Sequence, residues 1–240
     1  IVVFDEASQV RVAAAIPAMG RAKSTIVVGD SQQMPPSKKI GKREISAEDA
    51  ADLDDESYSQ DLESILTECS ESNLPSLMLK CHFRSQHEGL IAFSNRNFYD
   101  GSLVTFPAPN TDQTTPIHWF DVPGGQFVRK GDGKGTNPQE ATAVVAEVVR
   151  RLNDPEHASK SIGVVTFNEA QAGAITELLE AETANEPALA KAMSNPKKSD
   201  KLFVVPLERV QGDERDTIIL SVSYSYQSDK RGPNSVSPTW

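Results

Sequence analysis

Cysteine is scarce in this 240-residue sequence, which has only Cys69 and Cys81. Two cysteines cannot build the disulfide framework of a small secreted protein, so we expect a reducing, cytoplasmic setting. No apolar run approaches the roughly 20 residues that span a bilayer, so we expect no membrane partner. The cysteines, His82 and His87 lack the spacing of zinc ligands, and there is no G-x-S-x-G nucleophile motif. These absences leave a chain without disulfides, a zinc site or a serine-hydrolase signature.

An excess of positive charge is also missing, because the formal net charge is −10. The imbalance is local: eleven of the 34 acidic residues and none of the 24 basic ones lie in residues 44–71. The rest of the chain is nearly neutral, which leaves room for a basic track along one face. We expect the acidic segment itself to be a mobile, solvated linker or insertion.

Short apolar runs alternate with amphipathic stretches along the chain. The runs predict strands at residues 1–4, 25–28, 77–83, 117–122, 161–167, 202–208 and 217–224. Between them we expect a short helix or loop at 10–23, helices at 87–99, 137–152 and 168–180, and a polar excursion at 181–200. Alternating strands and helices predict an α/β fold whose parallel sheet carries helices on both faces.

Two of the expected helices carry clear start signals. Asn137 is placed to cap the first, with Pro138 in the first helical position and Glu140 three residues after the cap. Asn168 and Gln171 give the second the same cap spacing. These two helix starts are the most specific local predictions in the sequence.

Polar residues follow several expected strands at their carboxyl ends, where ligands collect in parallel sheets. Examples are Asp5, Glu6, Asp30, Arg84 and Thr166. The opening stretch IVVFDEASQ raises two interpretations. In one, the strand ends in solvated acids; in the other, Asp5 holds a Mg²⁺ ion through water and Glu6 orients the water that attacks a nucleoside triphosphate.

Five segments in order favour the second interpretation: FDEAS, VVGDSQQMPPS, LKCHFRSQHEGLIAFSNRNFYDGSL, SIGVVTFNEAQ and VQGDERDTIILS. Together they resemble, in order and spacing, motifs II, III, IV, IVa and V of the superfamily 1 DNA/RNA helicases. The nearest branch is that of the nonsense-mediated-decay helicase and bacterial AAA-domain relatives. The resemblance covers most of the chain and is weakest in the acidic segment and in residues 181–200.

The resemblance implies roles for residues around a nucleotide. Gln33 matches the glutamine that senses the γ-phosphate, and Arg84 matches the arginine that reaches the γ-phosphate from the second domain. Phe83 stands where the family usually has a tyrosine that stacks on adenine, and it keeps the aromatic face. The acid near the ribose and phosphates corresponds to Glu214, beside Gln211 and Gly212.

The resemblance also implies a contact with nucleic acid. Thr166 and the capped start of the next helix at Asn168 match a phosphate contact on the bound strand. The implied cofactors are ATP and Mg²⁺, and the implied partner is single-stranded DNA or RNA. The implied assembly is a monomeric motor.

The fold implied is a RecA-like P-loop NTPase fold, truncated at both ends. Residues 1–37 would end the first RecA-like domain, 38–73 would be the acidic linker or insertion, and 74–240 would be an incomplete second RecA-like domain. The sequence has no G-x-x-x-x-G-K-[ST] phosphate-binding loop, and motif VI is missing too. We therefore expect the fragment by itself to be inactive.

The function implied is that of part of an ATP-dependent helicase or translocase, which couples ATP hydrolysis to movement along single-stranded DNA or RNA. A non-catalytic nucleic-acid-binding or regulatory module of a degenerate helicase is the main alternative. A third class, a small-molecule ATPase or phosphotransferase, predicts no stimulation by nucleic acid.

Overall fold

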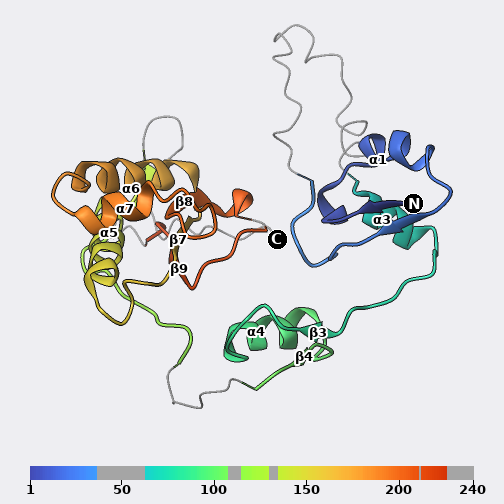
Figure 1. Cartoon of the computed structure of the whole chain (residues 1–240), viewed down its shortest axis with the longest axis horizontal. Helices are drawn as coiled ribbons and strands as arrows, with labels where there is room; N and C mark the ends of the chain where they lie inside the picture. Colours follow the sequence, from blue (N-terminus) through green and yellow to red (C-terminus); the bar gives the residue numbers. More distant parts are fainter. Residues whose placement is uncertain (37–62, 108–114, 130–134, 211, 226–240) are drawn as a thin grey trace, which may run out of the picture. The chain divides into compact units, whose positions relative to one another are not determined.

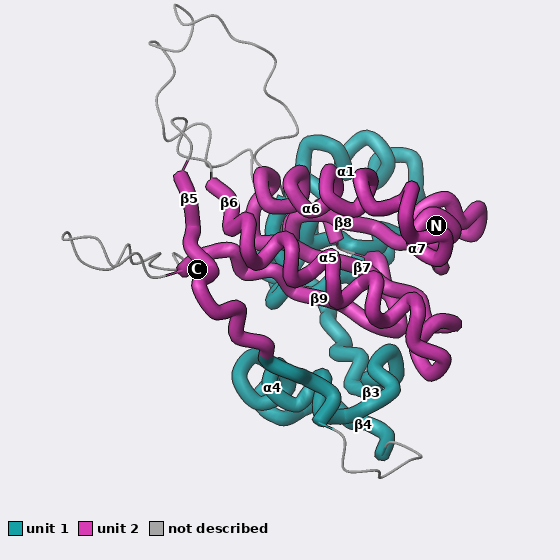
Figure 2. Tube along the Cα trace, turned by 90° about the vertical axis from the view of Figure 1, so that its left-hand side faces the viewer, with its two compact units in different colours: residues 1–119 teal, residues 120–240 magenta. Residues whose placement is uncertain are grey.

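The computed structural model describes residues 1–36, 63–107, 115–129, 135–210 and 212–225. The chain forms two compact units, Ile1–Trp119 and Phe120–Trp240, which are coloured separately in Figure 2. None of the described helices is long and apolar enough to cross a membrane. The expected family boundary at residue 74 does not coincide with the division into units, and it stays a prediction.

The first part of unit 1 is built on two short parallel strands, β1 (Val2–Phe4) and β2 (Thr25–Val27). They pair in register, and the 3₁₀ helix η1 (Ala7–Gln9) and helix α1 (Val12–Met19) connect them (Figure 1). Helix α3 (Ile65–Glu71) starts at Ser64, whose hydroxyl accepts a hydrogen bond from the Thr67 amide. Both strands lie where the sequence predicts them.

Helix α3 changes the interpretation of the acidic segment at its carboxyl end. Ile65 is 3% exposed and packs with the buried side chains of Ala7 and Ala15. The last residues of the segment therefore form a docked helix and not a solvated linker, because Ile65 and its neighbours Leu66 and Cys69 pack in a small core. The expectation for residues 44–62 lies outside the described residues.

The second part of unit 1 contains β3 (Cys81–His82), helix α4 (Gly89–Phe98) and β4 (Val104–Thr105). The two strands pair in parallel, and α4 connects them (Figure 1). The strand expected over 77–83 is only two residues long, and Leu77 and Leu79 are 87% and 75% exposed. The apolar run alone predicted too long a strand, since none of the described strands pairs with its first half.

Unit 2 is organised around a three-stranded parallel sheet in the order β8-β7-β9. Strand β7 (Ile162–Thr166) lies in the centre and is buried along its whole length. Its neighbours are β8 (Phe203–Pro206) and β9 (Thr217–Ser221), which pair with it in parallel. Full burial explains why the sequence of β7 is continuously apolar.

Helices α5 (Pro138–Asn153), α6 (Glu169–Glu182) and α7 (Pro187–Met193) supply most of the core of unit 2 (Figure 1). The buried side chains of Val148, Ile175, Leu179 and Leu189 pack with Val164 of the central strand. On β9, by contrast, Ile218 and Leu220 are 41% and 60% exposed. The buried side chains of these helices therefore pack on one face of this sheet.

Other elements of unit 2 partly correct the sequence predictions. An antiparallel pair, β5 (Val128–Arg129) and β6 (Gly135–Thr136), precedes α5, and the 3₁₀ helix η2 (Leu207–Arg209) follows β8. The predicted strand 117–122 does not form, and Trp119 and Phe120 are exposed. Helix α7 lies in the expected polar excursion, with Leu189 in the core. The mixed α/β class agrees with the sequence prediction. The expected sheet with helices on both faces is corrected: among the described residues the strands form separate short sheets, and the core helices of unit 2 pack on one face of the three-stranded sheet.

Candidate functional site

The acid pair lies directly after β1, as the sequence predicts. Asp5 and Glu6 are both exposed, and an Asp5 carboxylate oxygen accepts the Glu6 amide at 3.0 Å. Glu6 has φ 51° and ψ 40°, a left-handed conformation that is uncommon outside glycine. The backbone bonds from Ala7 to Val28 and from Gln9 to Glu6 hold this turn. Both carboxylates therefore face solvent at the edge of the sheet.

The loop after β2 lies at the same edge, because β1 and β2 are parallel and in register. Gly29 brings the two loops together: a Cβ at this position would stand 3.1 Å from the amide nitrogens of Ala7 and Ser8. Asp30 and Gln33 follow, and Gln33 is exposed. The loops that carry Asp5 and Glu6 after β1 and Gln33 after β2 therefore start from the same edge of the sheet.

Asp30 is the polar centre of this loop. Its Oδ1 accepts the Gln32 amide at 2.9 Å, and its Oδ2 accepts Gln33 Nε2 at 3.1 Å. The Tyr99 hydroxyl donates to the same Oδ2 at 2.6 Å. Burial of the phenol and the Asp30 carboxylate beside it raise the pKa of Tyr99 to about 12. Tyr99 therefore stays protonated and remains a donor at neutral pH.

Phe83 and Arg84 lie in the segment between β3 and α4. The Phe83 ring is 81% exposed, so its face is available for stacking, and Arg84 is exposed as well. His82 closes the turn around them: its Nε2 lies 2.9 Å from the Ser85 hydroxyl and accepts the Ser85 amide at 3.3 Å. This bond shapes the backbone that carries the aromatic ring and the guanidinium.

The carboxyl end of β7 carries the residues expected to contact nucleic acid. Thr166 is fully buried, and its hydroxyl donates to the backbone oxygen of Asn168 at 2.8 Å. Asn168 caps α6 by accepting the Gln171 amide, and its Nδ2 donates to the Ser223 hydroxyl at 2.7 Å. Both side chains have partners within the chain, and their contact with a phosphate stays a prediction.

Sequence reasoning missed a buried polar network at this edge. The Glu140 carboxylate accepts the Ser221 hydroxyl at 2.7 Å and the Ser223 amide at 2.9 Å. Gln171 Nε2 donates to Ser221, and Gln171 Oε1 accepts the Asn137 amide. Glu140 and Gln171 were predicted only as cap-position residues, because cap spacing is local and reveals nothing of the distant strand β9.

The segment between η2 and β9 carries the remaining expected nucleotide contacts. Gly212 has φ +85°, and Glu214 is exposed. Gln211 lies outside the described residues. The Arg215 guanidinium lies 4.6 Å from the centre of the Phe203 ring and donates to the backbone oxygen of Glu214 at 2.6 Å. Arg215 therefore anchors the carboxyl end of this segment to β8.

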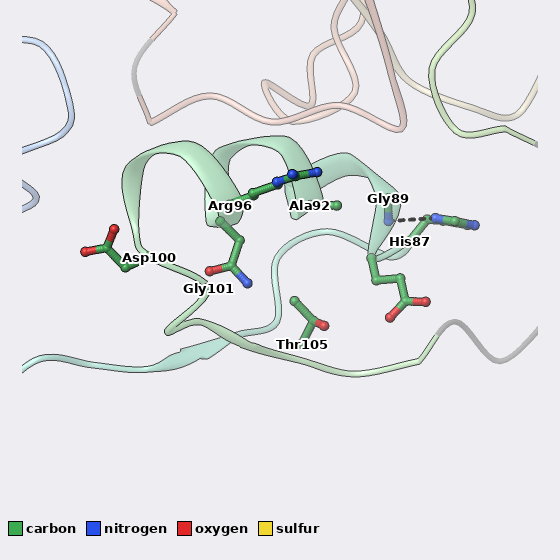
Figure 3. A pocket seen from close by; sticks show the side chains of 9 residues that line it. His87, Gly89, Ala92, Arg96, Asp100, Gly101 and Thr105 are labelled. Atoms are coloured by element: carbon green, nitrogen blue, oxygen red, sulfur yellow. Dashed lines mark hydrogen bonds between the residues drawn. The ribbon is translucent and has the colours of Figure 1, made fainter.

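A cavity of about 710 Å³ opens beside α4, lined by His87, Arg96, Asp100 and their neighbours. Figure 3 shows that the side chains of Arg96 and Asp100 point away from each other along its rim. The Gly89 amide donates to His87 Nδ1 at 3.0 Å, which shapes one wall. None of the predicted catalytic residues lines the cavity, so it is not the expected nucleotide site.

Carboxylates are the relevant metal ligands here. Within the part of the chain that the structure describes, no group of three or more His, Cys, Asp or Glu residues is placed to hold a metal ion. Mg²⁺ usually takes only one or two protein carboxylates and completes its shell with water and phosphates. The exposed carboxylate of Asp5 fits this pattern, because a single protein carboxylate leaves the other ligand positions to water and phosphate.

The chain matches the family described as "AAA domain" over residues 61–234. A Mycoplasma genitalium protein named as an uncharacterized ATP-dependent helicase is 35% identical over 241 residues, covering 97% of this chain and 20% of that protein. Its homolog in Mycoplasma pneumoniae is 34% identical over 242 residues, which again cover 97% of this chain and 20% of that protein. The chain thus spans 20% of the length of these curated relatives.

The chain belongs to this AAA-domain family, and it is a relative of the superfamily 1 helicases. An AAA-type domain implies the P-loop NTPase class of fold, in agreement with the mixed α/β architecture. The resemblance that the five segments indicate is therefore confirmed.

Proposed function

We propose that this chain is part of an ATP-dependent helicase or translocase that moves along single-stranded DNA or RNA. The observation that carries the proposal is that the loops with Asp5, Glu6 and Gln33 leave the same carboxyl edge of the parallel pair β1–β2. The names of the Mycoplasma relatives support ATP use and a helicase-type activity. The working form would be a cytoplasmic, monomeric motor.

The two-domain arrangement is part of the same proposal. Residues 1–37 would close the first RecA-like domain, 38–73 would be an insertion, and 74–240 would form the second RecA-like domain. ATP would bind in the cleft between such domains and contact residues from both.

The exposed carboxylates suit two separate tasks in hydrolysis. Asp5 would hold Mg²⁺ through water, and the ion when bound neutralises phosphate charge. Glu6 would orient the attacking water by accepting a hydrogen bond from it. The amide of Gln33 offers both a donor and an acceptor, so it can contact a γ-phosphate oxygen and the attacking water.

The remaining nucleotide contacts would come from two other segments. Arg84 would bring a permanently charged, planar guanidinium to the γ-phosphate, where negative charge spreads in the transition state. Phe83 would stack on the adenine with its exposed face. Glu214, with Gln211 and Gly212, would contact the ribose and phosphates.

The contact with the nucleic-acid strand would lie at the carboxyl end of β7. Thr166 and Asn168 stand at the start of α6, where backbone amides and the helix dipole favour a phosphate. Their side chains already hold bonds within the chain, so the helix start itself would present the donors. Such contacts carry no base readout, and we expect binding that tolerates any sequence and weakens strongly with salt.

The test is the ATPase activity of the full-length protein with and without single-stranded DNA or RNA. We expect turnover that the nucleic acid stimulates, and a Glu6→Gln variant that still binds both ligands but no longer hydrolyses ATP. Hydrolysis without stimulation would favour a small-molecule ATPase. Nucleic-acid binding without hydrolysis would favour the non-catalytic regulatory module.

A further inference from the structure

The Asp30 carboxylate joins two segments of unit 1 that are far apart in the sequence. One is the loop after β2 that carries Gln33, and the other is the end of α4 at Tyr99. Gln33 Nε2 and the Tyr99 hydroxyl donate to the same oxygen, Oδ2, at 3.1 Å and 2.6 Å. A change in the Tyr99 bond therefore acts directly on the acceptor that holds Gln33.

The bond from Tyr99 has the features of a strong hydrogen bond. A short O–H···O⁻ bond to a charged acceptor is stronger than a neutral one. The pair is partly buried, and the raised pKa keeps the phenol protonated at neutral pH. The bond also fixes the carboxylate plane, because Oδ1 is held at the same time by the Gln32 amide.

Tyr99 is itself held firmly by the structure around α4. It caps the carboxyl end of the helix, and its amide donates to the Asn95 backbone oxygen at 3.3 Å. The Asn95 side chain clamps Leu103, bonding both its amide and its carbonyl at 3.0 Å. The same helix begins at Gly89, shortly after Arg84, so α4 connects the Arg84 segment to Tyr99.

We propose that Tyr99 is a positioning residue, which aligns the γ-phosphate-sensing Gln33 with the Arg84 segment through Asp30. The proposal rests on the proposed function, since it assigns Gln33 and Arg84 to the ATP site. Tyr99 touches neither ATP nor water in this role. Through the Asp30 carboxylate, Tyr99 fixes the side-chain amide of Gln33 and connects it to α4, the helix that follows Arg84.

The experiment compares Tyr99→Phe with wild type in the full-length protein, using ATP hydrolysis stimulated by single-stranded nucleic acid. Phe keeps the ring and removes only the hydroxyl. Because one hydrogen bond to a charged acceptor is lost, we expect kcat to fall about tenfold and KM for ATP to stay within about twofold. Tyr224→Phe is the matched control, since the Tyr224 ring packs on Phe127 and is not among the residues assigned to ATP; it should retain wild-type kcat.

A double variant separates positioning from a structural role. If Tyr99 acts through Gln33, then Tyr99→Phe should have no further effect on kcat in a Gln33→Ala background. Equal losses in both backgrounds, or a kcat within about twofold of wild type for Tyr99→Phe alone, would overturn the inference.

Failure of the proposed function would look different. Wild-type protein without stimulated ATPase activity, or a Gln33→Ala variant as active as wild type, would overturn the assignment of the site and this inference with it. A Gln33→Ala variant that is inactive beside a fully active Tyr99→Phe variant would overturn the role of Tyr99 alone.

Discussion

At the carboxyl ends of the parallel strands, unit 1 presents several exposed polar side chains and unit 2 holds fully buried ones. After β1 and β2, the side chains of Asp5, Glu6 and Gln33 face solvent. In the last positions of β7 and β9, Thr166 and Ser221 are fully buried. The two kinds of side chain meet different requirements of a site. Exposed groups can reach a ligand, whereas buried, hydrogen-bonded groups fix the backbone around the ligand-binding residues.

The two units differ in the same way in their cores. In unit 1 the core beside β1 and β2 is a small cluster around Ala7, Ala15 and Ile65, and many large apolar side chains of the unit are exposed. Unit 2 packs three helices on β7 around a larger cluster that includes Val164 and Leu179. Substitutions should therefore affect activity most in unit 1 and stability most in unit 2.

The largest effect is expected for Arg84→Ala in the full-length protein. An arginine that stabilises phosphoryl transfer contributes on the order of 10³–10⁵ in rate, so ATP turnover should fall by that factor. Because the side chain is exposed, the melting temperature should stay close to that of wild type. Turnover within about tenfold of wild type at equal stability would mean that Arg84 is structural.

The next effect concerns stability and uses two adjacent leucines of α6. Leu179 is 0% exposed and Leu178 is 37% exposed. Leu179→Ala should lower the free energy of unfolding by about 3–5 kcal/mol, because it leaves a cavity in the core. Leu178→Ala makes the same chemical change at a partly exposed position and should cost about 1 kcal/mol or less. Denaturant unfolding measures both, and equal losses would break the contrast between core and surface.

A smaller effect is expected at Glu140, which accepts bonds from Ser221 and Ser223. Glu140→Ala leaves buried donors without their acceptor and should cost about 1–3 kcal/mol of unfolding free energy. Gln139→Ala, at an exposed position in the same turn of α5, is the control and should be close to neutral. If the two variants unfold alike, the buried network does not stabilise the edge of unit 2.

The smallest effect is the pH dependence contributed by Asp216. Bonds from the amide and hydroxyl of Ser161 hold the pKa of this carboxyl below its ordinary range. The folded state therefore gains stability above the unfolded pKa of about 3.9, and loses it as the pH falls through the lower folded value.

Asp216→Asn should thus destabilise the protein at neutral pH, by less than about 1 kcal/mol because the group is largely exposed to solvent. The difference from wild type should shrink as the pH falls below about 4. Thermal melting across this pH range measures the change, with Asp213→Asn on the same loop as control. A difference that is constant with pH would contradict the linkage.

Local sequence determined several elements correctly. Asn137 and Pro138 start α5, and Asn168 caps α6, because a cap depends only on residues three positions apart. The continuous apolar run of β7 was equally informative, since both faces of that strand are buried. The order and spacing of five segments along the chain indicated the family, which the comparisons confirm.

Tertiary structure decided what these local signals do not contain. The strand predicted at 117–122 has no pairing partner among the described residues and does not form. Residues expected to be a polar excursion instead include helix α7, whose Leu189 packs in the core. The bonds from Tyr99 to Asp30 and from Ser221 to Glu140 join residues far apart in the sequence. No sequence period encodes such pairs, because they exist only once folding brings separate segments within hydrogen-bonding distance.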